Sequence, residues 1–267
     1  MEDRITVDIQ DGVADVRLVR VDKMNALDDA MFEALVKTGE RLKTEPGVRA
    51  VVLSGAGRAF CAGLDMGNFD KMASGERKGG TGLVETPRTE GGSNRAQHAV
   101  MVWREIPVPV IAAVHGVAFG GGFQLALGAD MRFVTPDARM AVMEIKWGLV
   151  PDMAGIALLR RLIRDDQARE LTYSGRQFTG EEALSLGLAT RVCADPYAEA
   201  LAFARDVASK NPDAIRADKR LMNLADDGDQ RAILLAESVE QSALIGSPNQ
   251  IEAVLSSMQK RAPNFVN

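Results

Sequence analysis

The sequence predicts an α/β fold in which helices cover a β-sheet, followed by a helical C-terminal region. Apolar runs of β type at 50–53 and 108–114 each lead into a glycine-bearing turn. A strand–turn–strand pattern at 5–18 and a helix precede the first of these runs. From Pro196 onward the pattern is helical throughout. Strands that alternate with helices in this order are typical of a sheet covered by helices.

The N-terminal elements follow from local signals. Apolar and polar residues alternate over 5–9, and the strand pattern resumes at 16–18 after the tight-turn pair Asp11-Gly12, which predicts a hairpin. A loop over 20–25 comes next, and a helix begins at about Asp28. The buried stripe of that helix falls near helical spacing and consists of Leu27, Met31, Leu35 and Leu42.

Residues 66–98 form a long connection with scattered charges and seven glycines. Connections of this length are usually functional or mobile, and a disordered surface loop is the alternative. A helix resumes over 95–105, and Pro107 and Pro109 close it.

Shorter elements follow the strand that ends at Val114. We expect a strand at 133–134, a turn at 151–155 and a helix over 156–163. Thr179 has capping-box spacing to Glu182 and starts a helix that runs through Leu186, and a strand at 189–192 comes after it. Four helices then begin at proline or aspartate, over 196–209, 212–225, 229–245 and 248–261.

Composition excludes several classes of protein. The 267 residues are 46% apolar and 26% charged, as in ordinary globular chains, and the net charge of −5 argues against a nucleic-acid partner. The two cysteines, Cys61 and Cys193, have neither disulfide-framework nor metal-site spacing. The first residues lack the pattern of a signal peptide, and the apolar tract 108–129 is too interrupted to cross a membrane. We therefore expect a cytoplasmic protein without a metal or a membrane partner.

Two glycine-bearing segments carry the strongest chemical signal. Glycine is costly inside a helix, so the triplet 120–122 at the start of a helical pattern indicates close approach to the backbone. Backbone N–H groups at such a start could stabilise a developing oxyanion, although helix–strand packing of small residues is the alternative. The segment 54–65 also follows a strand. Two such units can bring two N–H groups to one carbonyl oxygen.

Both segments resemble the crotonase (enoyl-CoA hydratase/isomerase) superfamily. The resemblance covers nearly the whole chain in family order and spacing, and it implies a crotonase-like ββα-superhelix core. It places the core with the acyl-CoA site at residues 1–195 and a helical oligomerisation or lid region at 196–267. The matching motifs are Asn25-Ala26-Leu27, Ala59-Phe60-Cys61-Ala62-Gly63-Leu64-Asp65, His115-Gly116 with Gly120-Gly121-Gly122, and Gly148-Leu149-Val150-Pro151.

The resemblance also implies roles for individual residues. The N–H groups of Ala62 and Gly121 match the oxyanion hole that holds the thioester carbonyl of an acyl-CoA. Hydratases of the family use two glutamates, whose positions here hold Gln124 and Glu144. An amide can orient water but cannot take its proton, so this departure puts two-glutamate hydration in doubt. Asp152 stands where dienoyl-CoA isomerases of the family have an acid, and a role at a helix N-terminus is the alternative.

Coenzyme A is expected as part of the substrate, with no permanently bound cofactor. The family resemblance places the adenine along the backbone of 23–27, and basic residues near the C-terminus reach CoA phosphates, in some members from a neighbouring subunit. A homotrimer or dimer of trimers is implied. The residues expected to line the CoA thioester are Lys23, Asn25, Ala26, Ala62, Gly63, Leu64, Asp65, Gly121 and Lys260, of which Asp65 is expected to be structural.

The residues leave four functions to compare. Double-bond isomerisation needs only one positioned base, Glu144, and is therefore slightly favoured. True hydration of a 2-enoyl-CoA remains open if Gln124 orients water or Asp152 supplies the second acid. A non-catalytic acyl-CoA-binding protein is the alternative outside enzymes, and hydrolysis or carbon–carbon cleavage of an acyl-CoA would use the same oxyanion hole.

Overall fold

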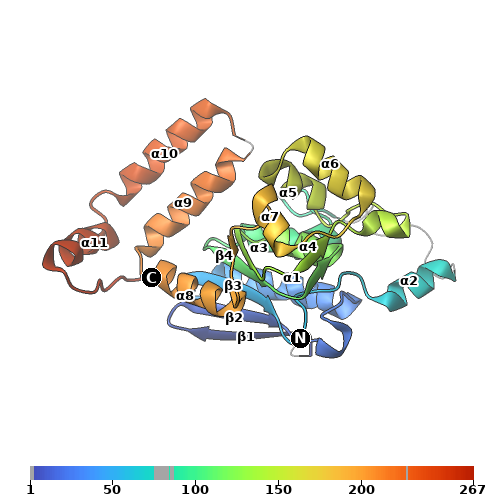
Figure 1. The fold of residues 1–267 in the computed structure, drawn as a ribbon. Helices are drawn as coiled ribbons and strands as arrows, with labels where there is room; N and C mark the ends of the chain where they lie inside the picture. Colours follow the sequence, from blue (N-terminus) through green and yellow to red (C-terminus); the bar gives the residue numbers. More distant parts are fainter. Residues whose placement is uncertain (1–2, 75–83, 85–86, 227) are drawn as a thin grey trace.

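The computed structural model describes residues 3–74, 84, 87–226 and 228–267. Its main sheet has the strand order β1-β2-β3-β4-β6-β8, in which β1 and β2 form an antiparallel hairpin and the later neighbours are parallel (Figure 1). The hairpin and the strands expected near 50, 110, 133 and 190 are confirmed. Their bounds are β1 Ile5–Gln10, β2 Val13–Leu18, β3 Ala50–Gly55, β4 Val110–Val114, β6 Met131–Val134 and β8 Arg191–Val192.

Helices cover both faces of this sheet. Side chains alternate along β3, so Val51 and Leu53 pack into the core shared with α1 (Asp29–Thr44) and α3 (Arg95–Glu105). Ala50 and Val52 point to the other face, which α8 (Pro196–Ala208) covers with a row of alanines. Small residues at i, i+4 spacing let this helix lie close to the sheet. The row consists of Ala200, Ala204 and Ala208.

Side-chain caps hold the two inner helices at their starts. The Asp28 carboxylate accepts a hydrogen bond from Met31 N at 2.8 Å, and Asn94 forms a reciprocal capping box with Gln97. The helix over 95–105 therefore begins and ends where its sequence signals place it.

Two elements of the middle region differ from expectation. A second, two-stranded parallel sheet joins β5 (Val117–Phe119) to β7 (Arg139–Ala141). The connection 66–98 begins with a helix, α2 (Met66–Ala73), instead of irregular chain. Residues 75–83 and 85–86 of this connection lie outside the described residues, so the choice between a functional connection and a disordered surface loop is not tested there.

Short helices follow the second sheet in the chain. The 3-10 turn η2 (Glu144–Trp147) leads to α5 (Gly155–Leu162), α6 (Asp165–Ser174) and α7 (Gly180–Leu186), and η1 (Val21–Lys23) precedes α1. The helix α6 was not expected. The Thr179 hydroxyl accepts from Glu182 N at 3.1 Å, which confirms the cap of α7.

The C-terminal helices project from the sheet (Figure 1). α9 (Pro212–Ala225), α10 (Gln230–Leu244) and α11 (Pro248–Gln259) confirm the expected helices to within a few residues. The chain end returns to the core, where Arg49 donates to Phe265 O and to Asn267 Oδ1. Across the described residues, every helix is too short or too polar to cross a membrane.

Candidate active site

The two glycine-bearing segments lie side by side at the small sheet. Cys61 N donates to Val117 O at 3.1 Å, and Cys61 O accepts from Phe119 N at 3.2 Å. These bonds pair Cys61 with Ala118 in parallel register. The segments remain in contact beyond this pair, because a Cβ on Gly63 would lie 3.7 Å from Gly121 N. The two strand–turn units therefore come together, as their positions after β3 and β4 predicted.

The backbone of 62–64 directs its N–H groups to different sides. Ala62 N donates to Met24 O at 2.9 Å, so the N–H that the sequence assigned to an acyl ligand is already used within the protein. Gly63 O accepts from Leu27 N at 2.8 Å. Because C=O and N–H of a trans peptide point in opposite directions, Leu64 N–H points away from Leu27. Among the described residues, it has no acceptor.

Glycine is required at position 63 for two reasons. Its φ of +89° belongs to the left-handed region, and this turn of the backbone sets the direction of the next N–H. A Cβ there would lie 2.4 Å from Phe119 O and 3.7 Å from Gly121 N. The segment that carries Leu64 N–H is therefore packed directly against the start of α4 (Gly121–Leu127).

The glycine triplet combines close packing with a second available donor. A Cβ at Gly122 would lie 2.3 Å from Cys61 O, which leaves no room for a side chain. Gly120 O accepts from Gln124 N at 2.9 Å, so the N–H of Gly121, on the same peptide, points out of the helix. In the described part of the chain this N–H likewise has no acceptor. Leu64 and Gly121 thus offer two neighbouring backbone donors.

Glu144 lies beside these donors at the start of η2. Its side chain is 9% exposed, and a Cβ at Gly120 would be 3.1 Å from Glu144 Oε1. That oxygen accepts from Gln124 Nε2 at 2.6 Å, whereas the buried Oε2 has no partner within the described residues. Burial raises the pKa of Glu144, and the negative charge of Asp152 acts in the same direction. Glu144 is therefore a buried acid and not a surface carboxylate.

Gln124 is 1% exposed and connects three segments. Its Oε1 accepts from Met153 N at 2.9 Å and from Gly155 N at 2.8 Å, while its Nε2 donates to Glu144. The amide oxygen is therefore occupied by the backbone, and the expectation that it orients a water molecule finds no support in this geometry.

Asp152 is exposed and lies on the turn between η2 and α5. It precedes the first residue of α5, Gly155, by three positions, so it is not in the first turn of that helix. Its negative charge adds to the effect of burial in raising the pKa of Glu144.

The residues expected at coenzyme A differ in their surroundings. Lys23 is exposed, whereas Ala26 is buried and its carbonyl accepts from Arg20 at 3.0 Å. Asp65 Oδ1 accepts a hydrogen bond from Gly67 N at 2.8 Å, and Asp65 Oδ2 pairs with Arg20 at 2.5 Å, and both contacts lower the pKa of Asp65. Because Arg20 also pairs with Asp28, the Asp65 carboxylate is tied to the loop before α1. A structural role for Asp65 agrees with these contacts.

Asn25 holds the loop together from inside. It is fully buried with φ +57°, and its Nδ2 lies within hydrogen-bond distance of the carbonyls of Ala56, Ala59 and Phe60. Its side chain thus serves the fold and does not reach outward to a ligand. The neighbouring Cys61 thiol is also buried, and burial raises its pKa to about 12, which is unfavourable for a nucleophile.

Replacement of Asn25 by aspartate tests this internal role. A carboxylate would face three carbonyl oxygens without a proton to donate, so we expect Asn25→Asp to lower the free energy of unfolding by about 3 kcal/mol. Urea denaturation measures the change. Asn223→Asp is the matched control, because Asn223 makes a single half-buried bond to Arg104 O. Equal losses in the two variants would contradict the assignment.

Lys260 is not brought to this site within one chain. It caps α11 with φ +52° and is exposed, and in Figure 1 α11 lies on the opposite side of the molecule from α2. Contact between Lys260 and a ligand at Leu64 and Gly121 would therefore require a second subunit.

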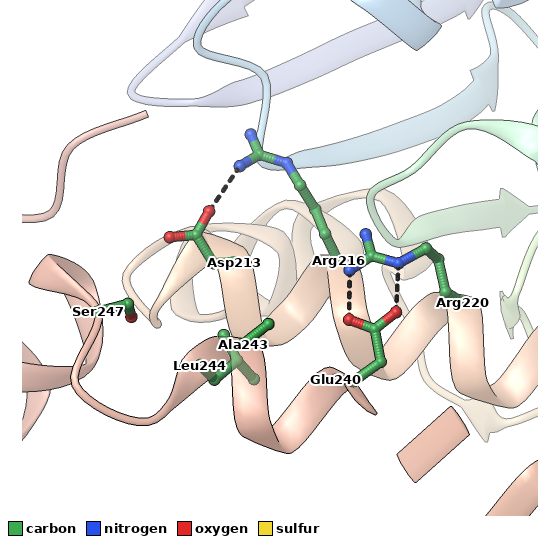
Figure 2. A pocket seen from close by; sticks show the side chains of 7 residues that line it. All are labelled: Asp213, Arg216, Arg220, Glu240, Ala243, Leu244 and Ser247. Carbon is green, nitrogen blue, oxygen red and sulfur yellow. Dashed lines mark hydrogen bonds and ion pairs between the residues drawn. The ribbon is translucent and has the colours of Figure 1, made fainter. Parts of the chain in front are cut away.

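Two further groups of charged residues are internally paired. A surface hollow of about 180 Å³ separates α9 from α10, and Figure 2 shows that its charges are paired, Arg220 with Glu240 at 2.7 Å and Arg216 with Asp213 at 3.6 Å. Between α1 and α3, the ammonium of Lys43 bonds two carboxylates that, with His98, would otherwise resemble a metal-ligand set.

A family model and several known proteins match this chain over most of its length. A model of the enoyl-CoA hydratase/isomerase family matches residues 8–267. The chain is 31% identical to the mitochondrial Delta(3,5)-Delta(2,4)-dienoyl-CoA isomerase of Mus musculus, over 94% of this chain and 78% of that protein. It is 33% identical to a probable enoyl-CoA hydratase of Mycobacterium tuberculosis, over 96% of both chains.

Solved structures show the same fold. A putative enoyl-CoA hydratase from Streptomyces coelicolor A3(2) superposes with a TM-score of 0.88 at 31% identity, over 98% of this chain and 94% of that one. An enoyl-CoA hydratase from Bacillus anthracis superposes with a TM-score of 0.86 at 27% identity, over 98% of both. The α/β crotonase fold is thereby confirmed, and the chain is an enzyme that belongs to the enoyl-CoA hydratase/isomerase family.

Proposed function

We propose that this enzyme moves a carbon–carbon double bond within an enoyl-CoA thioester, with Glu144 as its acid/base. One observation carries the proposal. Among the carboxyl groups of the described residues, only that of Glu144 is buried, and its Oε2 has no hydrogen-bond partner there. The two available N–H donors lie beside it. A single base that takes a proton from one carbon and returns it to another is sufficient for isomerisation.

The thioester carbonyl would accept hydrogen bonds from Leu64 N–H and Gly121 N–H. Removal of a proton next to the thioester places negative charge on this oxygen, and two donors that are already oriented stabilise the enolate-like state. Ala62, which the motif position suggested, is replaced in this role by Leu64 because the Ala62 N–H is bonded to Met24 O. CoA would lie along the exposed Lys23 and the adjoining backbone.

Hydration is the second candidate, and one observation favours it. Asp152 is close enough to influence the pKa of Glu144, so it could act as a second carboxyl group in water addition. The relatives of this chain include a probable enoyl-CoA hydratase of Mycobacterium bovis and the mitochondrial methylglutaconyl-CoA hydratase of Mus musculus.

Parallel absorbance assays distinguish the candidates. The purified protein is tested with a 3-enoyl-CoA, a dienoyl-CoA and crotonyl-CoA. We expect the conjugated-enoyl signal to appear from the 3-enoyl substrate, or the dienoyl band to shift. Rapid loss of signal from crotonyl-CoA would favour hydration instead. Silence with all three substrates, together with tight acyl-CoA binding, would contradict both reactions and favour a binding protein.

The pH dependence of the reaction follows from the environment of Glu144. Burial and Asp152 raise its pKa, and the base acts only as the carboxylate. The value of kcat/KM should therefore fall as pH decreases through this raised pKa, at a higher pH than an ordinary glutamate would give. A pH–rate profile measures the position of this limb. A limb at the pH of an exposed glutamate would contradict the burial argument.

We also propose that the helical region 196–267, apart from α8, which packs on the main sheet, forms the contacts of a homotrimer or dimer of trimers, while 1–195 carries the site. α10 contains no buried residue, and apolar side chains on α10 and α11 are exposed. Light scattering should give the mass of three or six chains, and Leu235→Glu should lower it. A monomer at assay concentration would contradict this proposal. The exposed apolar residues are Leu234, Leu235, Val239, Val254, Leu255 and Met258.

A further inference from the structure

Gln124 is the link between the acid/base residue and the turn that follows it. It comes from α4, the helix that begins at Gly121, and it is almost completely buried. Its side chain makes three hydrogen bonds of 2.6 to 2.9 Å. It accepts two from the backbone N–H groups of Met153 and Gly155, just before and at the start of α5, and it donates one to Glu144. A Cβ at Gly155 would lie 2.7 Å from its Oε1, so the contact depends on glycine there.

We propose that Gln124 is a positioning residue: it holds Glu144 with Oε1 engaged and Oε2 left as the sole proton carrier. It also ties this carboxyl group to the turn that bears Asp152. This inference rests on the proposed role of Glu144, and it replaces the direct catalytic role that the sequence suggested for Gln124.

The orientation of the Gln124 amide is determined by its partners. Two N–H donors, from Met153 and Gly155, converge on one atom, which must therefore be the oxygen. The NH2 group is then directed at Glu144 Oε1, where it can only donate. A donor at 2.6 Å favours the carboxylate form of Glu144 and restrains its rotation.

The two oxygens of Glu144 consequently differ. Oε1 is fixed by Gln124, and Oε2 is buried without a partner in the described part of the chain. A buried polar atom without a partner is costly, so its persistence is typical of a functional site. The same oxygen can take a proton from one substrate carbon and deliver it to another without rearrangement of the side chain.

A carboxylate at position 124 would keep the hydrogen bonds to the turn before α5 but would replace the donor that faces Glu144 with an acceptor. In Gln124→Glu, one oxygen still accepts from Met153 N and Gly155 N, but the other faces Glu144 Oε1 without a hydrogen to donate. Two carboxyl groups so close cannot both ionise easily, and one retains a proton. Asp152 is the further charged group that acts on Glu144, and it is unchanged in the variant.

The test compares Gln124→Glu with Gln124→Leu and with a matched control, Gln177→Glu, at an exposed glutamine. Carbon-13 NMR of labelled glutamate carboxyls follows the titration of Glu144, which is assigned with Glu144→Gln. We expect the Glu144 titration to move to higher pH in Gln124→Glu, kcat at neutral pH to fall roughly tenfold or more, and KM to change little. The control should titrate like the parent enzyme.

Hydrogen exchange separates positioning from a merely structural role. The amides of Met153 and Gly155 should stay protected in Gln124→Glu, which keeps their acceptor, and exchange faster in Gln124→Leu, which removes it. An unchanged Glu144 titration in a folded Gln124→Glu protein would overturn the inference. This readout does not need turnover, so it remains decisive even if the parent enzyme proves inactive on enoyl-CoA substrates and the proposed reaction fails.

Discussion

Glu144→Gln is expected to lower kcat by roughly 10²- to 10⁴-fold while acyl-CoA binding persists. The substitution preserves the size of the side chain, and its amide oxygen can still accept from Gln124 Nε2. What it removes is the ability to carry a proton at the buried position next to Gly120. Steady-state kinetics with a 3-enoyl-CoA and calorimetric binding of a saturated acyl-CoA measure the two effects separately.

Because the pKa of Glu144 is raised, the loss of turnover in Glu144→Gln can be separated from a loss of stability. A raised pKa means that the ionised side chain is less favourable in the folded protein than in the unfolded chain. The neutral amide should therefore not reduce stability at neutral pH, and lost turnover cannot be attributed to unfolding. Glu181→Gln, at an exposed residue of α7, is the control. If Glu144→Gln turned over substrate as fast as the parent enzyme, Glu144 would not be the acid/base of the reaction.

Gly63→Ala should reduce kcat by about 10²- to 10³-fold, the usual effect of losing one oxyanion donor. An alanine Cβ would lie 2.4 Å from Phe119 O, so the backbone must move and carry Leu64 N–H with it. Because the N–H acts most strongly on the developing charge, kcat should fall more than binding weakens. Kinetics with the same 3-enoyl-CoA measure the change.

Gly246→Ala is the matched control for backbone strain. Gly246 has φ +79°, close to the +89° of Gly63, but nothing lies within 4 Å of its added Cβ. Both variants therefore carry the strain of a left-handed alanine, and only one displaces the proposed donor. If the two variants retain the same kcat, the loss cannot be assigned to the Leu64 N–H.

Much of the fold is encoded in short-range patterns. The hairpin, the helix of 95–105 and the four C-terminal helices have their caps, turns and apolar spacing within a few neighbouring residues, and the sequence predicted each of them. α6 also has such signals, acidic residues at 165 and 166 and a glycine after its last turn, and these could have predicted it. β5 and β7 are only three residues long, too short for a periodic pattern.

The site was predictable in its segments but not in its bonds. The glycine motifs correctly brought 61–64 and 120–122 together. Which N–H is available depends on the bonds of Ala62 to Met24 and of Gly63 to Leu27, whose partners are 36 or more residues away. The role of Gln124 likewise depends on Met153 and Gly155, which are 29 and 31 residues distant. Motif spacing alone contains no information about these distant contacts.

The most direct test of the account is the mass of the product that the enzyme makes from a 3-enoyl-CoA, with crotonyl-CoA in parallel. Isomerisation through Glu144 predicts a 2-enoyl-CoA of unchanged mass and little conversion of crotonyl-CoA. A product from either substrate that has gained one water molecule, at a rate equal to or above isomerisation, would contradict the single-base account and assign a second proton carrier to the site.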